Sequence, residues 1–255
     1  MESTFKIEGT GVQGATLGTG FIMGRPFPNQ PSKARYVLIT AAHVLEEMQG
    51  DSASLHLHTR AGNGSWVRTI IPLPIRNNNQ RLWTKHPDAD VAVMYIRLPN
   101  NSIPLLPTEL LADDKALSEF EIHPGDELQC LGYPLGMEAN GEGFPVLRSG
   151  KIASYPLLPG DRLKTFLFDF RVFKGNSGGP VYFVQSTRTY GGATHMETIH
   201  FIIGLVSQES LVQQHISGPY SEEMRQFQLG LAVVVHASLI KQAINLLPSP
   251  ETLPD

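Results

Sequence analysis

Short runs of apolar or alternating residues, each ended by turn-forming residues, recur along almost the whole of this chain. Runs of this kind are typical of β-strands. The predicted strands are Thr16–Met23, Tyr36–Thr40, Ser54–His58, Trp66–Pro72, Val91–Leu98, Glu127–Tyr133, Gly150–Ser154, Thr165–Phe170, Pro180–Val184, His200–Val206 and Leu229–Val235. Because 24 glycines and 19 prolines supply turns within 255 residues, and no helical segments alternate with the strands, the pattern predicts an all-β barrel or sandwich.

Only two segments have the pattern of a helix. Ala41–Met48 is a short candidate that directly follows a predicted strand. Ala237–Leu247 is longer, because its apolar residues recur at helical spacing and Pro248 ends the pattern. We therefore expect one short helix and one C-terminal helix on a body of strands.

A stretch rich in proline, asparagine and aspartate, Pro99–Gly125, interrupts the strand pattern. We interpret it as the joint between two β-lobes, each long enough to bury a core of its own. The expected organisation is an N-terminal lobe at residues 1–115, a C-terminal lobe with the final helix at 116–248, and a tail at 249–255.

Net charge and composition limit the classes of binding partner and the cellular compartment that we expect for this protein. The formal net charge is −4, which argues against nucleic acid as a partner because phosphate binding needs a surplus of Lys and Arg. No apolar run approaches the ~20 residues that a membrane span needs, and the first residues lack the pattern of a signal peptide. Cys130, the single cysteine, excludes an intrachain disulfide and is expected to be an inert core thiol. We therefore expect a cytoplasmic protein with no membrane partner.

The segment Gly175–Pro180, directly before a predicted strand, holds a serine among glycines. Serine is a weak nucleophile unless a base removes its proton and backbone donors stabilise the resulting oxyanion. Glycines allow a sharp turn and a close approach of substrate. In such a turn we expect the N–H groups of Gly175 and Ser177 to point at one spot. Ser177 is therefore a candidate nucleophile, with an ordinary glycine-rich turn as the alternative.

A second candidate is His43, which follows a predicted strand and two small residues, Ala41 and Ala42. The alanines allow the chain to pack tightly beneath the imidazole. Histidine titrates near neutral pH, so His43 is a candidate general base. Taken alone, the alternative is a partly buried structural histidine.

A third candidate is Asp90, a carboxylate at the start of an apolar strand. Its useful partner is the ring N–H of a histidine, because that bond selects the tautomer and stabilises the imidazolium. Asp88 is the rival, but it follows Pro87 in a looser stretch. We therefore rank Asp90 above Asp88.

In the order His43, Asp90, Ser177, these residues resemble the triad of the chymotrypsin-like serine peptidases, and most closely the bacterial HtrA-like branch, here without its usual PDZ domain. The matching stretches are Gly18–Ile22, Ile39–His43, Asp90–Val93, Leu131–Pro134, Gly175–Pro180, Ile203–Val206 and Gly230–Val233. The resemblance implies two six-stranded Greek-key β-barrels with the triad in the cleft between them. It also implies Ser177 as nucleophile, His43 as general base, Asp90 as its orienting partner, the Gly175 and Ser177 amides as oxyanion hole, and no cofactor or metal.

The same resemblance places the pocket for the residue before the cut bond near Arg171, Val172, Val206 and Ser207. If Arg171 faces this pocket, its guanidinium favours Asp or Glu by bidentate pairing. If it faces outward and pairs with Asp169, an apolar floor set by Val172 favours a medium-sized hydrophobic residue, as in HtrA-like relatives. The expected partner is a peptide or protein substrate.

Two other functions are open at this point. A catalytically silent module on the same fold would use the same cleft to hold peptides, and a collapsed oxyanion turn leaves no trace in sequence. An esterase or lipase is disfavoured, because Ser177 lacks the strand–elbow–helix context of α/β-hydrolases. The sequence therefore predicts a serine endopeptidase, with the silent peptide-binding module as the alternative.

Two further motifs carry less weight. Gly9–Gly14 matches the G-x-G-x-x-G dinucleotide fingerprint, but no helix follows it, so we interpret it as a glycine-rich loop before the first barrel strand. His56 and His58 share one strand face, as two metal ligands do. No cysteine or carboxylate cluster accompanies them, so we expect a solvent-facing strand edge rather than a metal site.

Overall fold

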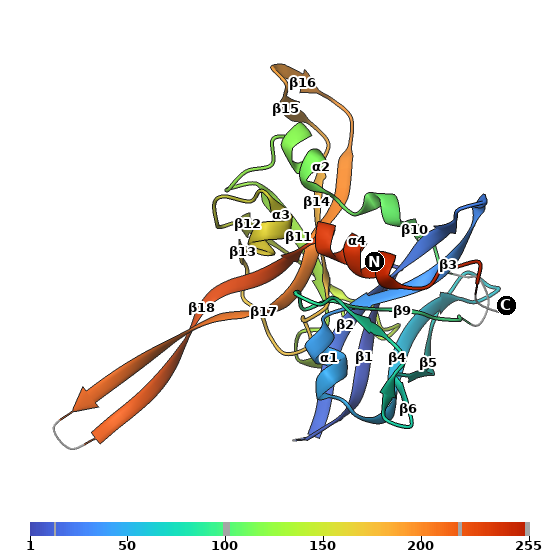
Figure 1. The fold of residues 1–255 in the computed structure, drawn as a ribbon, viewed down its shortest axis with the longest axis horizontal. Coiled ribbons are helices and arrows are strands. Elements are labelled where there is room, and N and C mark those ends of the chain that lie inside the picture. The colour runs from blue at the N-terminus through green and yellow to red at the C-terminus, as the bar shows by residue number, and fades with distance from the viewer. Residues whose placement is uncertain (13, 99–102, 219–220, 253–255) are drawn as a thin grey trace.

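Strands make up most of the protein and form two lobes (Figure 1). The computed structural model describes residues 1–12, 14–98, 103–218 and 221–252, except for the side chains of 211–228. Residues 99–102 of the predicted joint and residues 253–255 of the predicted tail lie outside the described residues. The expected all-β class with a C-terminal helix is confirmed.

The N-terminal lobe is built on an eight-stranded sheet. Its strands are β1 (Thr4–Gly11), β2 (Gly14–Phe27), β3 (Gln30–Thr40), β4 (Gln49–Arg60), β5 (Trp66–Pro74), β8 (Thr84–Lys85), β9 (Ala92–Tyr95) and β10 (Leu106–Pro107). Seven of them follow the order β5-β4-β1-β2-β3-β9-β8, and β10 pairs parallel with β2.

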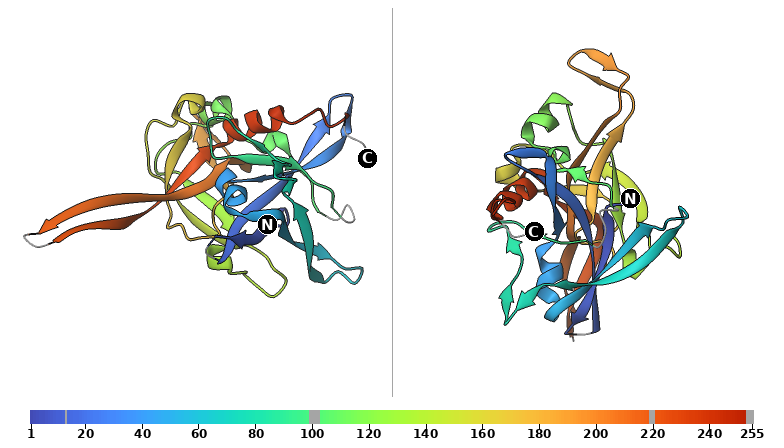
Figure 2. Two further views of the ribbon diagram at one scale, coloured as in Figure 1. Left: turned by 60° about the horizontal axis from the view of Figure 1, so that its bottom comes forward. Right: turned by 90° about the vertical axis from the view of Figure 1, so that its right-hand side faces the viewer.

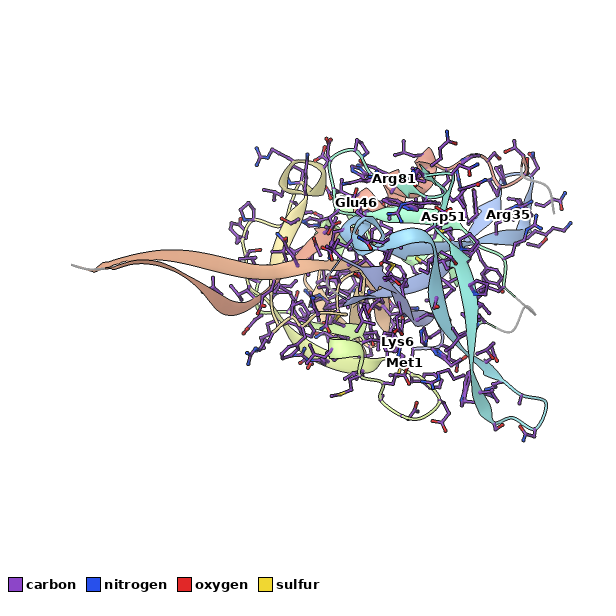
Figure 3. The ribbon with its side chains drawn as sticks, turned by 90° about the horizontal axis from the view of Figure 1, so that it is seen from below. Met1, Lys6, Arg35, Glu46, Asp51 and Arg81 are labelled. Atoms are coloured by element: carbon purple, nitrogen blue, oxygen red, sulfur yellow. The ribbon has the colours of Figure 1, made fainter. Side chains whose placement is uncertain are left out.

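A short helix, α1 (Ala42–Glu47), leaves the end of β3, within one residue of the predicted helix at each end. A small hairpin of β6 (Arg76–Asn77) and β7 (Gln80–Arg81) contacts this helix. Seen from below, Glu46 of α1 lies beside Arg81 of β7, with 3.1 Å between the charged groups (Figure 3). The hairpin of β6 and β7 therefore stabilises the position of α1, the helix that contains His43.

The C-terminal lobe is a closed barrel with the six strands that the sequence predicts, in the order β11-β12-β13-β18-β17-β14. They are β11 (Glu127–Gly132), β12 (Val146–Ile152), β13 (Thr165–Asp169), β14 (Pro180–Gln185), β17 (Ile199–Gly218) and β18 (Ser221–His236). The connecting elements are the 3-10 helices η1 (Thr108–Leu110) and η2 (Pro134–Gly136), the helices α2 (Asp114–Glu119) and α3 (Gly160–Leu163), and the hairpin of β15 (Arg188–Tyr190) and β16 (Ala193–His195). The chain ends its regular structure with α4 (Ala237–Leu246), one residue shorter than predicted.

The first strand differs from expectation. Residues Thr4–Gly11 form β1 and pair with both β2 and β4, so the glycines of Gly9–Gly14 lie at the end of β1 and the start of β2 rather than before the first strand. Residue 13 of this motif lies outside the described residues. The signal was a period-two alternation, because Phe5 and Ile7 are fully buried between more polar neighbours.

The strands β17 and β18 extend beyond the barrel as a long two-stranded arm (Figure 2). The predicted strands stop at Val206 and start at Leu229, whereas the pairing continues to Gly218 opposite Ser221. The segment between the two predictions is rich in Gln, Glu and Ser, so the apolar pattern that identifies a strand is weak there.

Each lobe has a hydrophobic core, and the first core includes the last helix of the chain. Leu239, Ile240 and Ala243 of α4 are buried in the core of the N-terminal lobe, together with Leu205 and Val235 from the C-terminal barrel. The final helix therefore packs against the lobe opposite to the one it follows in sequence. No helix in the described part of the chain has the length and apolar character that crossing a bilayer requires.

The middle of β2 lies between the two lobes. Residues Gly18–Gly24 are all buried, so both faces of this strand are covered. A Cβ on Gly20 would meet Ile7 inside the first lobe. Successive side chains alternate between faces, so Thr19 and Phe21 face the second lobe, where the Thr19 hydroxyl forms a hydrogen bond.

Candidate active site

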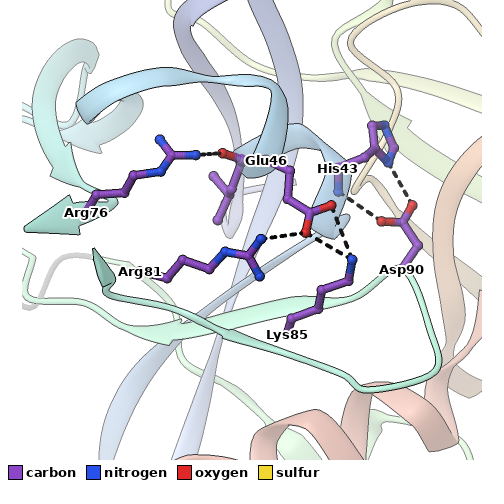
Figure 4. Close-up of polar contacts among 7 residues, drawn as sticks. His43, Glu46, Arg76, Arg81, Lys85 and Asp90 are labelled. Carbon is purple, nitrogen blue, oxygen red and sulfur yellow. Dashed lines mark hydrogen bonds and ion pairs between the residues drawn. The ribbon is translucent and has the colours of Figure 1, made fainter. Parts of the chain in front are cut away.

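His43 and Asp90 come from two neighbouring strands of the first sheet. β3 pairs antiparallel with β9, and Thr40 lies opposite Ala92 at the end of their ladder. His43 follows Thr40 by three residues, and Asp90 precedes Ala92 by two. The register therefore brings the imidazole and the carboxylate together at one end of the sheet (Figure 4).

Two hydrogen bonds join His43 to Asp90. Asp90 Oδ1 accepts from the His43 backbone N–H at 2.9 Å, and Oδ2 lies 2.7 Å from His43 Nδ1. The Ser207 hydroxyl also donates to Oδ2. Because Nδ1 is committed to Asp90, Nε2 is the ring nitrogen left to exchange a proton.

The two pKa values shift in opposite directions. Burial raises the pKa of Asp90, but the hydrogen bonds and charge of His43 and the hydrogen bond from Ser207 outweigh burial and lower it to about 2. Burial lowers the pKa of His43, and the hydrogen bond and charge of Asp90, with the charges of Glu47 and Glu46, outweigh burial and raise it. The carboxylate is therefore ionised at neutral pH, and the imidazole is a stronger base than an exposed histidine.

The rival carboxylate, Asp88, lies apart from His43. Its side chain is 63% exposed, and Oδ2 lies 3.7 Å from Lys164 Nζ. Its backbone N–H donates to the ring of His86. The structure thus pairs His43 with Asp90 rather than with Asp88.

The residues Lys174–Gly179, here named the serine turn, are anchored at nearly every peptide. Gly175 has φ of +94° and Gly178 has φ of +85°, values that favour glycine. The anchoring hydrogen bonds run from Leu135 N–H to Lys174 O at 2.6 Å, Asn176 N–H to Phe173 O at 3.0 Å, Thr19 N–H to Ser177 O at 2.8 Å, Gly178 N–H to Val206 O at 2.7 Å, and Gly179 N–H to Asn176 O at 2.9 Å.

The N–H groups of Gly175 and Ser177, on either side of Asn176, donate to no protein acceptor in the part of the chain that the structure describes. The carbonyls of the same two peptides, Lys174 O and Asn176 O, are held by hydrogen bonds. Since a peptide is planar, holding its carbonyl also fixes the direction of its N–H. Fixed, unoccupied donors beside a serine are what stabilisation of an oxyanion requires.

The serine turn reaches the strand that carries His43. A Cβ on Gly178 would collide with Thr40 Oγ1 and lie 2.9 Å from the backbone nitrogen of Ala41. Ala41 is two residues before His43, so Ser177 lies beside the start of α1. The described residues show no hydrogen bond between the Ser177 hydroxyl and the His43 ring, and such bonds are often long before substrate binds.

The serine turn also contacts strand β17 next to Ser207, the residue that donates a hydrogen bond to Asp90. Gly178 N–H donates to Val206 O, and Val206 N–H donates back to Gly179 O at 2.9 Å. The next residue, Ser207, donates to Asp90. One strand, β17, therefore positions the serine turn and the carboxylate at the same time.

The expected substrate-binding residues lie in three environments. Val172 and Val206 are buried at 6% and 0% exposure in the second core. Arg171 is exposed, and its guanidinium lies over the Phe173 ring at 5.3 Å. Ser207 is 6% exposed and bonds to Asp90, a contact that was not anticipated from the sequence. The assignment of these residues to a substrate pocket stays a prediction.

The two strand histidines are placed differently from expectation. His56 and His58 are 7% and 1% exposed, so the predicted solvent-facing edge is wrong. His56 Nε2 lies 3.1 Å from Glu8, and the His58 ring packs on the Phe144 ring with 4.1 Å between centroids. The described residues contain no group of three or more His, Cys, Asp or Glu side chains placed to hold a metal. Cys130 is buried, and burial raises its pKa to about 12, so it is an inert core thiol as predicted.

Thr19 is a further residue at this site that sequence reasoning missed. Its hydroxyl donates to Gly175 O at 2.5 Å, and its backbone N–H donates to Ser177 O. The only signal was its place in the stretch Gly18–Ile22, because the contact joins residues 156 positions apart.

Three solved structures match this chain at low sequence identity. The thermostable serine protease AL20 from an extremophilic microorganism has 12% identity and a TM-score of 0.51, with 96% of this chain and 95% of that chain covered. The serine endoprotease of Yersinia pestis has 17% identity and a TM-score of 0.48, and protease Anisep of Arthrobacter nicotinovorans has 14% and 0.48. The alignments with these two proteins each cover 96% of this chain, and the alignment with Anisep covers 94% of the Anisep chain. The chain spans 62% of the length of the Yersinia pestis chain.

The sequence itself matches a family. No curated protein matches the chain. The trypsin-like peptidase domain family matches residues 18–189, more than half of the chain, and this range includes His43, Asp90 and Ser177. The chain therefore belongs to the trypsin-like peptidase domain family, which confirms the expected resemblance to the chymotrypsin-like serine peptidases.

Proposed function

We propose that this protein cleaves peptide bonds with Ser177 as nucleophile, His43 as general base and then acid, Asp90 as the group that orients His43, and the N–H groups of Gly175 and Ser177 as the oxyanion hole. The proposal rests on two features that lie next to each other, the His43–Asp90 pair and the serine turn. An ionised Asp90 accepts a hydrogen bond from His43 Nδ1, and the N–H groups of Gly175 and Ser177 in the adjacent serine turn have no acceptor among the described residues. Family membership supports the same chemistry.

The reaction follows from these positions. His43 Nε2 takes the proton of Ser177 Oγ as Oγ attacks the carbonyl carbon of the substrate. The carbonyl oxygen becomes an oxyanion and accepts hydrogen bonds from the Gly175 and Ser177 N–H groups. The imidazolium, stabilised by Asp90, gives its proton to the leaving amine as the C–N bond breaks. Water, deprotonated by His43, then hydrolyses the acyl ester and restores the Ser177 hydroxyl.

A fluorophosphonate probe separates a peptidase from a silent peptide-binding module, because it labels only an activated serine. We expect the wild type to be labelled and to cleave a peptide library. Ser177→Ala and His43→Ala should each lose several orders of magnitude in rate. Ser65→Ala, at an exposed serine, is the matched control and should retain both. Peptide binding without labelling or cleavage would support the silent module instead.

The two aspartates provide a second pair of variants. Asp90→Asn removes the carboxylate that selects the His43 tautomer, so we expect kcat to fall on the order of 10⁴-fold. Asp88→Asn changes an exposed carboxylate that contacts Lys164 and should change kcat little. The reverse ranking would show that Asp90 is not the third member of the triad.

The residue preferred before the cut bond is proposed from the placement of Arg171 and Val172. The Arg171 guanidinium lies over Phe173, whereas Val172 contributes to the apolar second core. This arrangement supports a medium-sized hydrophobic preference, which the resemblance to HtrA-like peptidases also implies. Library profiles of wild type and Arg171→Ala should then agree, whereas an acidic preference that disappears in Arg171→Ala would contradict the proposal.

A further inference from the structure

Thr19 joins the two lobes at the serine turn. It lies in β2 of the first lobe and is 0% exposed. Its hydroxyl donates to Gly175 O at 2.5 Å and accepts from the Tyr133 N–H at 3.2 Å. Its N–H donates to Ser177 O at 2.8 Å, and its carbonyl accepts from Thr40 Oγ1 at 2.7 Å. Every polar atom of this buried residue is used, and three of its four contacts reach the second lobe.

We propose that the Thr19 hydroxyl is a positioning group for the oxyanion hole: it holds the Gly175–Asn176 peptide so that the N–H groups of Gly175 and Ser177 stay directed at one point. The inference rests on the proposed function, because it takes these two N–H groups as the donors to the oxyanion. It adds a side chain from the other lobe to a site whose donors are both backbone groups.

The order of peptides in the serine turn explains why this contact matters. The Gly175–Asn176 peptide lies between the two peptides that carry the donor N–H groups. Its carbonyl is held by Thr19, while the outer two carbonyls are held by other N–H groups. Glycine populates positive and negative φ with similar ease, so Gly175 by itself does not restrict rotation of this peptide. Rotation of the Gly175–Asn176 peptide would therefore move the neighbouring peptides that carry the Gly175 and Ser177 N–H groups.

The hydroxyl also connects the turn to the end of β11. A Cβ on Gly175 would collide with Tyr133 O, so the two segments already touch. Thr19 bridges them, because one hydroxyl bonds to both Tyr133 N–H and Gly175 O. Removing it leaves a buried donor and a buried acceptor unpaired, which favours rearrangement of the turn. The shape of the oxyanion hole therefore depends in part on the packing of β2 of the first lobe against the second lobe.

Kinetics test the role directly. Thr19→Val replaces the hydroxyl with a methyl group of similar size, and we expect kcat to fall by about 10- to 100-fold, with KM little changed. A peptide aldehyde forms a tetrahedral adduct with Ser177 whose oxygen occupies the oxyanion hole, so its affinity should fall by a similar factor. The pH dependence set by His43 should stay as in the wild type, because Thr19 does not contact the imidazole.

Three variants separate positioning from general loss of stability. Thr19→Ser keeps the hydroxyl and should restore most of the rate and the aldehyde affinity. Thr19→Ala removes the hydroxyl without adding a methyl, so it repeats the test if the valine variant does not fold. Ser3→Ala is the matched control: Ser3 is 3% exposed and donates one hydrogen bond, to Pro104 O at 2.9 Å. It should lower the melting temperature without changing kcat or aldehyde affinity.

Amide hydrogen exchange tests the inference separately from catalysis. In Thr19→Val the bonded amides of the serine turn, those of Asn176, Gly178 and Gly179, should exchange faster than in the wild type, whereas Ser3→Ala should leave them unchanged. Unchanged exchange, or an effect on kcat no larger than that of Ser3→Ala, overturns the role of Thr19. A wild type that neither cleaves nor labels contradicts the proposed function instead, and exchange still decides whether Thr19 holds the turn.

Discussion

The Asp90 carboxylate accepts hydrogen bonds from His43 and Ser207. Because these bonds shift the pKa values of Asp90 and His43, both the stability of the fold and the rate of the reaction should depend on pH. The pKa of Asp90 falls from its ordinary 3.8 to about 2. Its ionised form therefore stabilises the fold above pH 3.8, and this contribution is lost as the pH falls toward 2. The pKa of His43 is raised above 6.5, so its protonated form stabilises the fold below that pH, and this contribution is lost as the pH rises through the raised pKa.

At the same scale, the pH dependence of the reaction reports on the charges around His43. The base must be neutral, so kcat/KM should rise with pH with an apparent pKa above 6.5. Glu47 raises that pKa by its charge, so Glu47→Gln should move the rise to lower pH. Glu109→Gln, at another exposed carboxylate, should not move it. Rates that do not vary between pH 5 and 8 would exclude His43 as the base.

Among the elements, the short helix α1 depends on a side chain from the neighbouring hairpin. A helix of six residues is marginal by itself, and α1 has no basic residue in its last turn. Arg76 of β6 donates to three carbonyls at and after the C-terminal end of α1, those of Leu45, Met48 and Gly50, each at 2.8 Å. These bonds satisfy carbonyls that the helix leaves unpaired and stabilise the position of His43.

Arg76→Gln should therefore lower the free energy of unfolding by about 1–3 kcal/mol, because charged hydrogen bonds to the helix end are lost. Arg81→Ala is the control: Arg81 is 51% exposed and contacts Glu46, and such surface pairs contribute about 0–1 kcal/mol. Urea unfolding measures both. An Arg76→Gln protein as stable as Arg81→Ala would show that the carbonyl contacts do not stabilise α1.

Over the whole molecule, α4 connects the two lobes. It follows the last strand of the C-terminal barrel, yet Ile240 and Ile244 are buried in the core of the N-terminal lobe at 0% and 4% exposure. The same core contains Leu205 and Val235 of the second barrel. Because the first core is completed by residues from the far end of the chain, we expect the lobes to unfold as one unit.

Ile240→Ala should lower the free energy of unfolding by about 2–5 kcal/mol, as expected for a cavity in a packed core. Leu246→Ala, on the same helix but 54% exposed, should change it by only about 0.5 kcal/mol. Trp83, 5% exposed in the first core, reports on that lobe by fluorescence. If Ile240→Ala leaves the Trp83 transition unchanged, α4 does not stabilise the N-terminal lobe.

Local patterns in the sequence account for the elements and for the identity of the reactive groups. Period-two runs and glycine- or proline-rich turns predict most strands, and the residues around Ser177, His43 and Asp90 predict a peptidase. Both signals are local, because side-chain alternation and turn chemistry depend on a few adjacent residues. The same reasoning missed β1 and the arm of β17 and β18, where the alternation is short or weakly apolar.

Tertiary structure decided what depends on distant residues. The contact of Ser207 with Asp90 spans 117 positions, and that of Thr19 with Gly175 spans 156. Packing of α4 on the opposite lobe and burial of His58 among aromatic rings likewise depend on which surfaces meet. Sequence by itself therefore determined the strand-rich fold and the chemical groups of the site. Only the folded chain decided which atoms hold those groups in place, because long-range contacts follow from register and packing and leave no local pattern.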